Sequence, residues 1–149
     1  RIDAPKMFRD MENIDLEQVE LSDAMETLWN CRNIKLRHVS ADHADYLFMH
    51  SANIDIADYV HHGNYAFQYC RNVVIRDARI HAKDAFWNSE DVTVYDSEID
   101  GEFLGWHTKR LKLVNCRIKA LSRFAMQRIW CLKTARWIPT AISDLSIPP

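Results

Sequence analysis

Four side chains with metal-binding chemistry recur at nearly constant intervals along this chain. Asp42, His62, His81 and Asp100 follow one another at spacings of 20, 19 and 19 residues. Imidazole and carboxylate groups suit zinc and other divalent ions, so a divalent metal site is one interpretation, with no other cofactor expected. The other is a solvated column of turn residues, because no His-x-His or Cys-x-x-Cys phrase anchors a metal.

A second column with catalytic chemistry consists of Asp58, Asp77 and Asp96, again 19 residues apart. Carboxylates about 5 Å apart match the pair of a retaining glycosidase, and their repulsion would raise one pKa. Asp77 and Asp96 are therefore candidate catalytic residues. The alternative is an Asx-type bend in which each side chain caps backbone amides, and Asn115 continues that column.

Three tryptophans, Trp29, Trp87 and Trp106, form a candidate binding column that Met49 and Gln68 interrupt. If these rings point outward, they form an aromatic stripe suited to stacking on sugar rings or on a partner protein. If they point inward, they belong to the core. Strand alternation favours the outward direction.

All three columns follow one internal repeat. Its four-residue phrase consists of a polar residue, an apolar residue, any residue and a second apolar residue. The six copies begin at Asn13, Asn33, Asn53, Asn72, Asp91 and Arg110, in steps of 19 or 20 residues. We number this first residue position 0. Positions 1 and 3 have the two-residue period of a strand, and further apolar sites lie at positions 6 and 8 and at position −5, where Phe predominates.

Short strands at this spacing cannot bury a face alone, so they must stack rung on rung with the apolar columns turned inward. The pattern predicts a single-stranded parallel β-helix of about six rungs, roughly 4.8 Å apart. A leucine-rich repeat has units of similar length, but its L-x-x-L-x-L phrase and its helical segment are missing here. Cys31, Cys70 and Cys116 then become small buried residues, with Cys31 and Cys70 too far apart for a disulfide.

The repeat predicts a seventh position 0 at Ile129, but no phrase follows there. We therefore expect a β-helix over residues 1–119 and a non-repeat tail over residues 120–149. One hypothesis for the tail is a frameshift near Ala120, because a back-translation read one base earlier restores the phrase in register. The other is an amphipathic helix over about 121–137 that caps the open end. Since the chain opens in the middle of a rung, we also expect rungs before Arg1.

Several phrases resemble an uncharacterised bacterial family of β-helix proteins that is filed as a domain of unknown function. They are the segments 26–31 and 84–97 and the triplet Leu104-Gly105-Trp106. The resemblance covers about residues 1–119 and implies a right-handed, pectin lyase-like β-helix in the bacterial cytoplasm. It supplies no catalytic residue.

Composition narrows the choice of partner. The 149 residues carry a net charge of −2, which gives no electrostatic case for nucleic acid, and no run of 18 apolar residues predicts a membrane span. We expect a non-catalytic binding or scaffold rod that recognises carbohydrate or protein. The alternative is a polysaccharide lyase or glycoside hydrolase-like enzyme. The ligand and the oligomeric state stay open.

Overall fold

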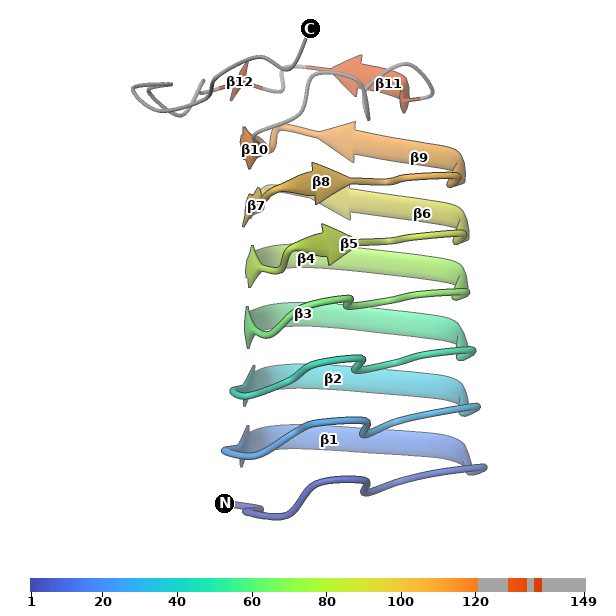
Figure 1. Ribbon diagram of the computed structural model, residues 1–149, viewed down its shortest axis with the longest axis vertical. Coiled ribbons are helices and arrows are strands. Elements are labelled where there is room, and N and C mark those ends of the chain that lie inside the picture. Colours follow the sequence, from blue (N-terminus) through green and yellow to red (C-terminus); the bar gives the residue numbers. More distant parts are fainter. Residues whose placement is uncertain (121–128, 134–135, 138–149) are drawn as a thin grey trace, which may run out of the picture.

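The computed structural model describes residues 1–120, 129–133 and 136–137 and shows a right-handed parallel β-helix. In Figure 1 the long strands of successive rungs stack as one sheet at the back of the rod. The more irregular segments of each rung lie in front. Four rungs contain one long strand each: β1 (Glu12–Leu21), β2 (Arg32–Ala41), β3 (Ala52–His62) and β4 (Arg71–His81). Among these residues no helix is long and apolar enough to cross a membrane.

The next two rungs divide the long strand at its bend. They contain β6 (Glu90–Tyr95) with β7 (Glu98–Gly101), and β9 (Lys109–Val114) with β10 (Arg117–Ala120). Two short strands, β5 (Asp84–Ala85) and β8 (Phe103–Leu104), pair with each other on the irregular face. The bend falls at position 5, as the one-residue interruption of the apolar pattern predicts.

Strand register follows the repeat without a slip from β1 to β9. Position 1 of each rung pairs in parallel with position 1 of the next, and this column is Ile14, Ile34, Ile54, Val73, Val92 and Leu111. A shift of one residue would turn every apolar side chain to the solvent face, so the buried columns fix this register. The predicted single-stranded parallel β-helix of about six rungs is confirmed.

The core is a set of stacked columns rather than a mixed interior. At position −5, Leu28, Phe48, Phe67 and Phe86 have no exposed surface. The ring centroids of Phe48 and Phe67 are 4.6 Å apart, and those of Phe67 and Phe86 are 5.2 Å apart, both in a stacked arrangement. Like residues therefore pack on like residues along the axis, which is why the chain repeats one residue type at this position.

Corners of the rungs are made by residues with positive φ, few of which are glycine. At position 0, Asn13, Asn33, Asn53 and Asn72 have φ between 54° and 59°. Asn and Asp tolerate this left-handed conformation better than other non-glycine residues. The phenylalanines of position −5 adopt it as well, at 60° to 69° for Phe48, Phe67 and Phe86. Buried stacking compensates there for a conformation that is uncommon in bulky residues.

Part of the tail continues the rod. Strand β11 (Ile129–Lys133) pairs in parallel with β9, and β12 (Arg136–Trp137) pairs with β10. The helix expected over about 121–137 is therefore wrong at these two segments, because pairing satisfies the open backbone groups of β9 and β10. The register shifts between Ile129 and Cys131, where the repeat phrase is missing. The rest of that predicted helix lies outside the described residues, and the frameshift stays a prediction.

Candidate functional site

The candidate metal column forms one line along the rod but divides into two pairs. His62 pairs in register with His81, and His81 with Asp100. The Nδ1 atom of His62 lies 3.9 Å from Oδ1 of Asp42, and Nδ1 of His81 lies 3.6 Å from Oδ2 of Asp100. The two imidazole centroids are 6.3 Å apart. In the described part of the chain, no three metal-ligating side chains converge on one point, so a metal here remains a prediction.

Two of the three aspartates of the second column line a small groove at the bend of the rungs, whereas Asp58 contacts the His38 ring. Asp77, Asp96 and Asn115 border a groove of about 360 Å³, which we call the short groove; His81 does not line it. Asp77 and Asp96 have φ of 51° and 48°, so both lie at a left-handed bend, a conformation that Asp tolerates. Oδ1 of Asp96 accepts a hydrogen bond of 2.6 Å from the side-chain carboxamide of Asn115 and not from a backbone amide.

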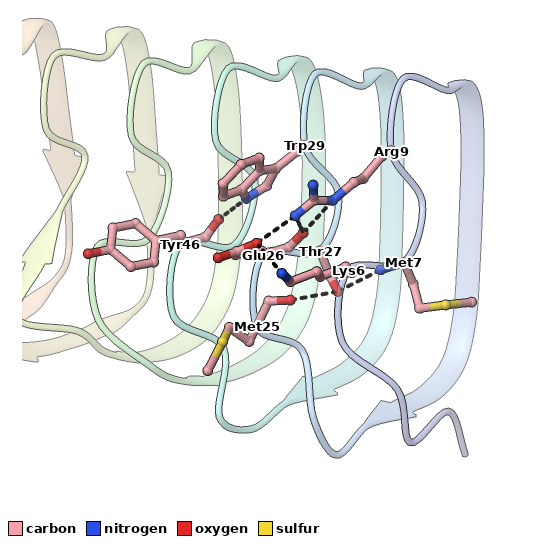
Figure 2. Close-up of polar contacts among 8 residues, drawn as sticks. All are labelled: Lys6, Met7, Arg9, Met25, Glu26, Thr27, Trp29 and Tyr46. Atoms are coloured by element: carbon pink, nitrogen blue, oxygen red, sulfur yellow. Dashed lines mark hydrogen bonds and ion pairs between the residues drawn. The ribbon is translucent and has the colours of Figure 1, made fainter.

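Trp29 points outward, but its ring and its polar atom both have partners. The Arg9 guanidinium lies 4.3 Å from the centroid of the Trp29 ring, and the indole N–H donates to the Tyr46 carbonyl at 2.5 Å (Figure 2). Arg9 also donates to the Glu26 carboxylate at 2.8 Å. Although desolvation opposes it, the bonds from Arg9 and Lys6 hold the pKa of Glu26 below its usual value. Trp29 is thus held in a local polar cluster.

The other two tryptophans form a separate cluster near the C-terminal end of the rod. The rings of Trp87 and Trp106 stack with their centroids 6.4 Å apart. Phe103 contacts Trp106 edge-on, with a centroid distance of 5.5 Å. Trp106 is 44% exposed, while Gln68 in the middle of the column is buried. Trp29 and Trp87 are half-buried. The three tryptophans thus reach the surface, the direction that strand alternation favours, while Gln68 does not. They form two aromatic clusters and not a continuous stripe.

A larger groove, of about 680 Å³, lies beside the tryptophan column. We call it the long groove. One wall is position −3, with Asn30, His50, Tyr69, Asn88 and His107. The other wall is position −1, with Arg32, Ala52, Arg71, Glu90 and Lys109. These walls run over five successive rungs, which corresponds to about 20 Å along the axis.

Small inward residues at position −2 explain why a groove forms between these walls. Their side chains donate to the carbonyl of position −5 in the preceding rung, as in Ser51 to Leu28 at 2.7 Å and Cys70 to Phe48 at 2.9 Å. The other members are Cys31, Ser89 and Thr108. Each side chain is occupied inside the rod, so nothing fills the strip between positions −3 and −1.

Three cysteines of the described rungs are buried and free, as predicted. Cys31, Cys70 and Cys116 form no disulfide. Burial raises the pKa of the Cys70 thiol to about 12, so its nucleophilic thiolate form is scarce near neutral pH. These thiols act as small core residues with a weak donor.

Two aromatic rings on the first wall of the long groove stack on each other. The rings of His50 and Tyr69 stack at 4.7 Å with an interplanar angle of 11°, and Tyr69 is 45% exposed. At the end of that wall, the ring centroids of His107 and Trp106 are 6.0 Å apart. This wall was not predicted from the sequence. Its signal was the run of polar and aromatic residues at position −3, which reads as a plain solvent column.

One polar pair lies inside the rod and was also missed as a pair. The hydroxyl of Tyr59 donates to Nδ1 of His61 at 2.8 Å, and Nε2 of His61 donates to the Gly63 carbonyl at 3.0 Å. Both side chains are fully enclosed. Burial lowers the pKa of His61 to about 4, so the imidazole is neutral near pH 7. Both imidazole nitrogens are hydrogen-bonded and the pair is closed to solvent, so we interpret it as a structural part of the core.

Comparisons with known proteins give one match. A family model described as a protein of unknown function (DUF3737) matches residues 1–143. No curated protein and no solved structure is similar enough to the chain to count as a match. The match extends past residue 119, where the regular phrase stops, and the resemblance to a family of unknown function is confirmed.

Proposed function

The chain belongs to the DUF3737 family of proteins of unknown function, and from this premise we propose that it is a non-catalytic rod that binds a carbohydrate chain lengthwise. The long groove is the proposed site. The observation that carries the proposal is the length of this groove, which extends over five rungs with polar and aromatic side chains repeated along one wall. An extended polymer is the ligand whose shape fits such a strip.

The chemistry of the position −3 wall supports a sugar ligand. Tyr69 and His50 stack on each other at the groove, so their ring edges, the phenolic hydroxyl and the imidazole nitrogens are the groups that meet a sugar chain. Asn30 and Asn88 add carboxamides, which both donate and accept and therefore match hydroxyl groups. Repetition at every rung allows several weak contacts to act together on one chain.

A glycan array followed by calorimetry tests this proposal. We expect the protein to retain an extended oligosaccharide, and Tyr69→Ala to weaken binding about tenfold, since an aromatic contact of this kind contributes on the order of 1 kcal/mol. Tyr95→Ala is the matched control. Tyr95 is also a partly exposed tyrosine, but it lies on a strand face outside the groove, near Arg76.

Two outcomes would overturn the proposal. One is that no glycan is retained at concentrations where the protein is a folded rod by circular dichroism. The other is that Tyr69→Ala and Tyr95→Ala weaken binding equally, which would place the ligand elsewhere.

A second candidate function is enzymatic, and the short groove favours it, because Asp77 and Asp96 both line that groove. The same oligosaccharides, incubated with the protein and sized by mass spectrometry, separate the two functions. Unchanged chain length supports the binding rod. Chain shortening that disappears in Asp77→Asn and Asp96→Asn would favour a glycoside hydrolase-like enzyme.

The buried free thiols also bear on location. Disulfides are rare in reducing compartments, and Cys31, Cys70 and Cys116 are all unpaired. On this ground we propose a cytoplasmic location, which fractionation of cells expressing the full-length protein tests.

A further inference from the structure

The second wall of the long groove carries its positive charges at alternate rungs. Arg32, Arg71 and Lys109 are exposed and line the groove at position −1. Strand register places Ala52 between the first two of these cations and Glu90 between the last two. Neighbouring cations are therefore two rungs apart, or about 10 Å.

These three cations differ from most others on the rod in having no carboxylate partner. Arg9 pairs with Glu26, while Arg37 and Arg76 both pair with Asp55. Within the described ranges, Arg32, Arg71 and Lys109 form no ion pair of 4.0 Å or less, although thirteen such pairs occur. Their charge is open to a ligand in the groove.

The one acidic residue of this wall is already engaged. Glu90 forms an ion pair with Arg110, which also binds Asp91. Glu90 therefore adds no unpaired anion to the groove, yet its carboxylate still occupies the rung between Arg71 and Lys109. Along this wall a ligand therefore meets cations at the first, third and fifth rungs. A neutral residue lies at the second rung and an already paired anion at the fourth.

We infer that the occupant of the long groove is an acidic polysaccharide in which a charged sugar alternates with a neutral one. A sugar in an extended chain advances by about the height of one rung, on the order of 5 Å. Carboxylates at every second sugar then face Arg32, Arg71 and Lys109, and the neutral sugars face Ala52 and Glu90. The amides and rings of the opposite wall contact hydroxyls at every rung.

The same register disfavours polymers that carry a charge on every residue. A homopolymer of uronic acids would set one carboxylate against Ala52 and another against Glu90, whose charge Arg110 already neutralises. Neither carboxylate would gain a cation as partner, although each would lose hydration. This inference rests on the proposed carbohydrate function and adds the charge pattern of the ligand.

Three hexasaccharide probes test the inference by calorimetry. The first alternates glucuronic acid with N-acetylglucosamine, the second is the same compound with its carboxyl groups reduced to alcohols, and the third is an oligogalacturonate. We expect the alternating acid to bind about tenfold more tightly than either of the others. Its affinity should also fall with added salt, because exposed ion pairs are screened.

Substitutions on one strand supply the matched control. Arg71→Glu should weaken binding of the alternating probe about tenfold and Arg71→Gln less. Arg79→Glu, the same change in β4 but beside the short groove, should change it less than twofold. Melting curves confirm that the variants fold, and Lys109→Gln repeats the test at a second rung.

The outcomes separate this inference from the function it rests on. If the reduced probe binds as well as the acid and Tyr69→Ala still weakens binding about tenfold, the groove binds carbohydrate but the charge pattern is irrelevant and the inference fails. If the oligogalacturonate binds best, alternation is wrong. If none of the three probes binds and the glycan array is also silent, the proposed function fails with it. Loss of binding in Arg79→Glu would move the site to the short groove.

Discussion

Positions −5 and −4 are neighbours in every rung, yet they meet opposite environments. At position −5 the rings of Phe48, Phe67 and Phe86 form one unbroken buried stack. At position −4 the outward column has Trp29 at one end, Trp87 and Trp106 at the other, and no aromatic residue between. In the core stack each ring packs on the next, between Leu28 and Gly105 at the same position, whereas an outward side chain needs no counterpart above or below it.

This difference teaches where function can be sought on a repeat fold. Regularity along an inward column reports stability. Departures from regularity on the outside, such as the paired tryptophans or the alternating cations of position −1, are free of that demand and are therefore informative about ligands. Substitutions in the inner columns test how strictly those columns obey this division.

The largest expected effect comes from opening the buried stack. Phe67→Ala removes the central ring, which contacts Phe48 on one side and Phe86 on the other. We expect the free energy of unfolding to fall by about 3–5 kcal/mol, the usual cost of a large core truncation that leaves a cavity. Urea denaturation measures this value.

Trp106→Ala is the outward control for that experiment and removes an even larger ring. Because the Trp106 side chain is 44% exposed, we expect a loss of less than about 1 kcal/mol. Equal losses in the two variants would contradict the division between inner and outer columns.

The second effect concerns the polar pair inside the rod. The pKa of His61 is lowered by burial from 6.5 to about 4, with Asp45 opposing and His62 and His81 adding to the shift. Between pH 6.5 and 4 the unfolded chain binds a proton that the folded chain refuses. Stability is therefore full above pH 6.5 and falls as the pH drops, by on the order of 3 kcal/mol at pH 4.

A double variant isolates this contribution from the other titrating groups. Tyr59→Phe with His61→Ile places in the column a residue that already occupies it at Ile80 and Ile99. As the pH falls, we expect the original protein to lose more unfolding free energy than the double variant, because the variant has no imidazole at position 61. A difference that stays constant from pH 7 to pH 4.5 would show that His61 does not titrate in this way.

The smallest effect concerns the inward hydroxyls of position −2. Ser89 accepts a hydrogen bond from the Cys70 amide at 3.2 Å and donates to the Phe67 carbonyl. Ser89→Ala leaves both backbone groups unsatisfied, so we expect a loss of about 1–3 kcal/mol. Ser89→Cys should lose less, because Cys31 and Cys70 fill the same position and make the same kind of bond. Equal losses would sink this assignment of the column.

The repeat arithmetic predicted the inner columns, the register and the outward direction of the tryptophans, because strand alternation and burial leave little freedom there. It did not predict that Phe48 and Phe67 adopt positive φ, since residue type argues against that conformation and only stacking in the assembled core supports it. The strand at Ile129 was missed because backbone pairing to β9 needs no apolar phrase.

The candidate site was less accessible to sequence reasoning. The long groove forms because the outward positions −3 and −1 flank the inward position −2 at a corner of the rung. The alternation of residue types does not predict the angle of that corner. Tyr69 and Arg71 lie two residues apart and belong to opposite walls, which becomes visible only once the bend is known. Asp77 and Asp96, in contrast, were found together because they share a column.

The constant separation between paired residues has a consequence for how the rod assembles. Every strand pairing from β1 to β9 joins residues 19 or 20 apart, so each new rung closes a loop of the same size and loses the same conformational entropy. Contacts never become more distant in sequence as the rod lengthens, in contrast to a folded sheet sandwich. Assembly then resembles the growth of a one-dimensional crystal, in which a finished rung is the seed for its neighbour. Duplication of a rung in evolution would lengthen such a rod without making any single step of its folding harder.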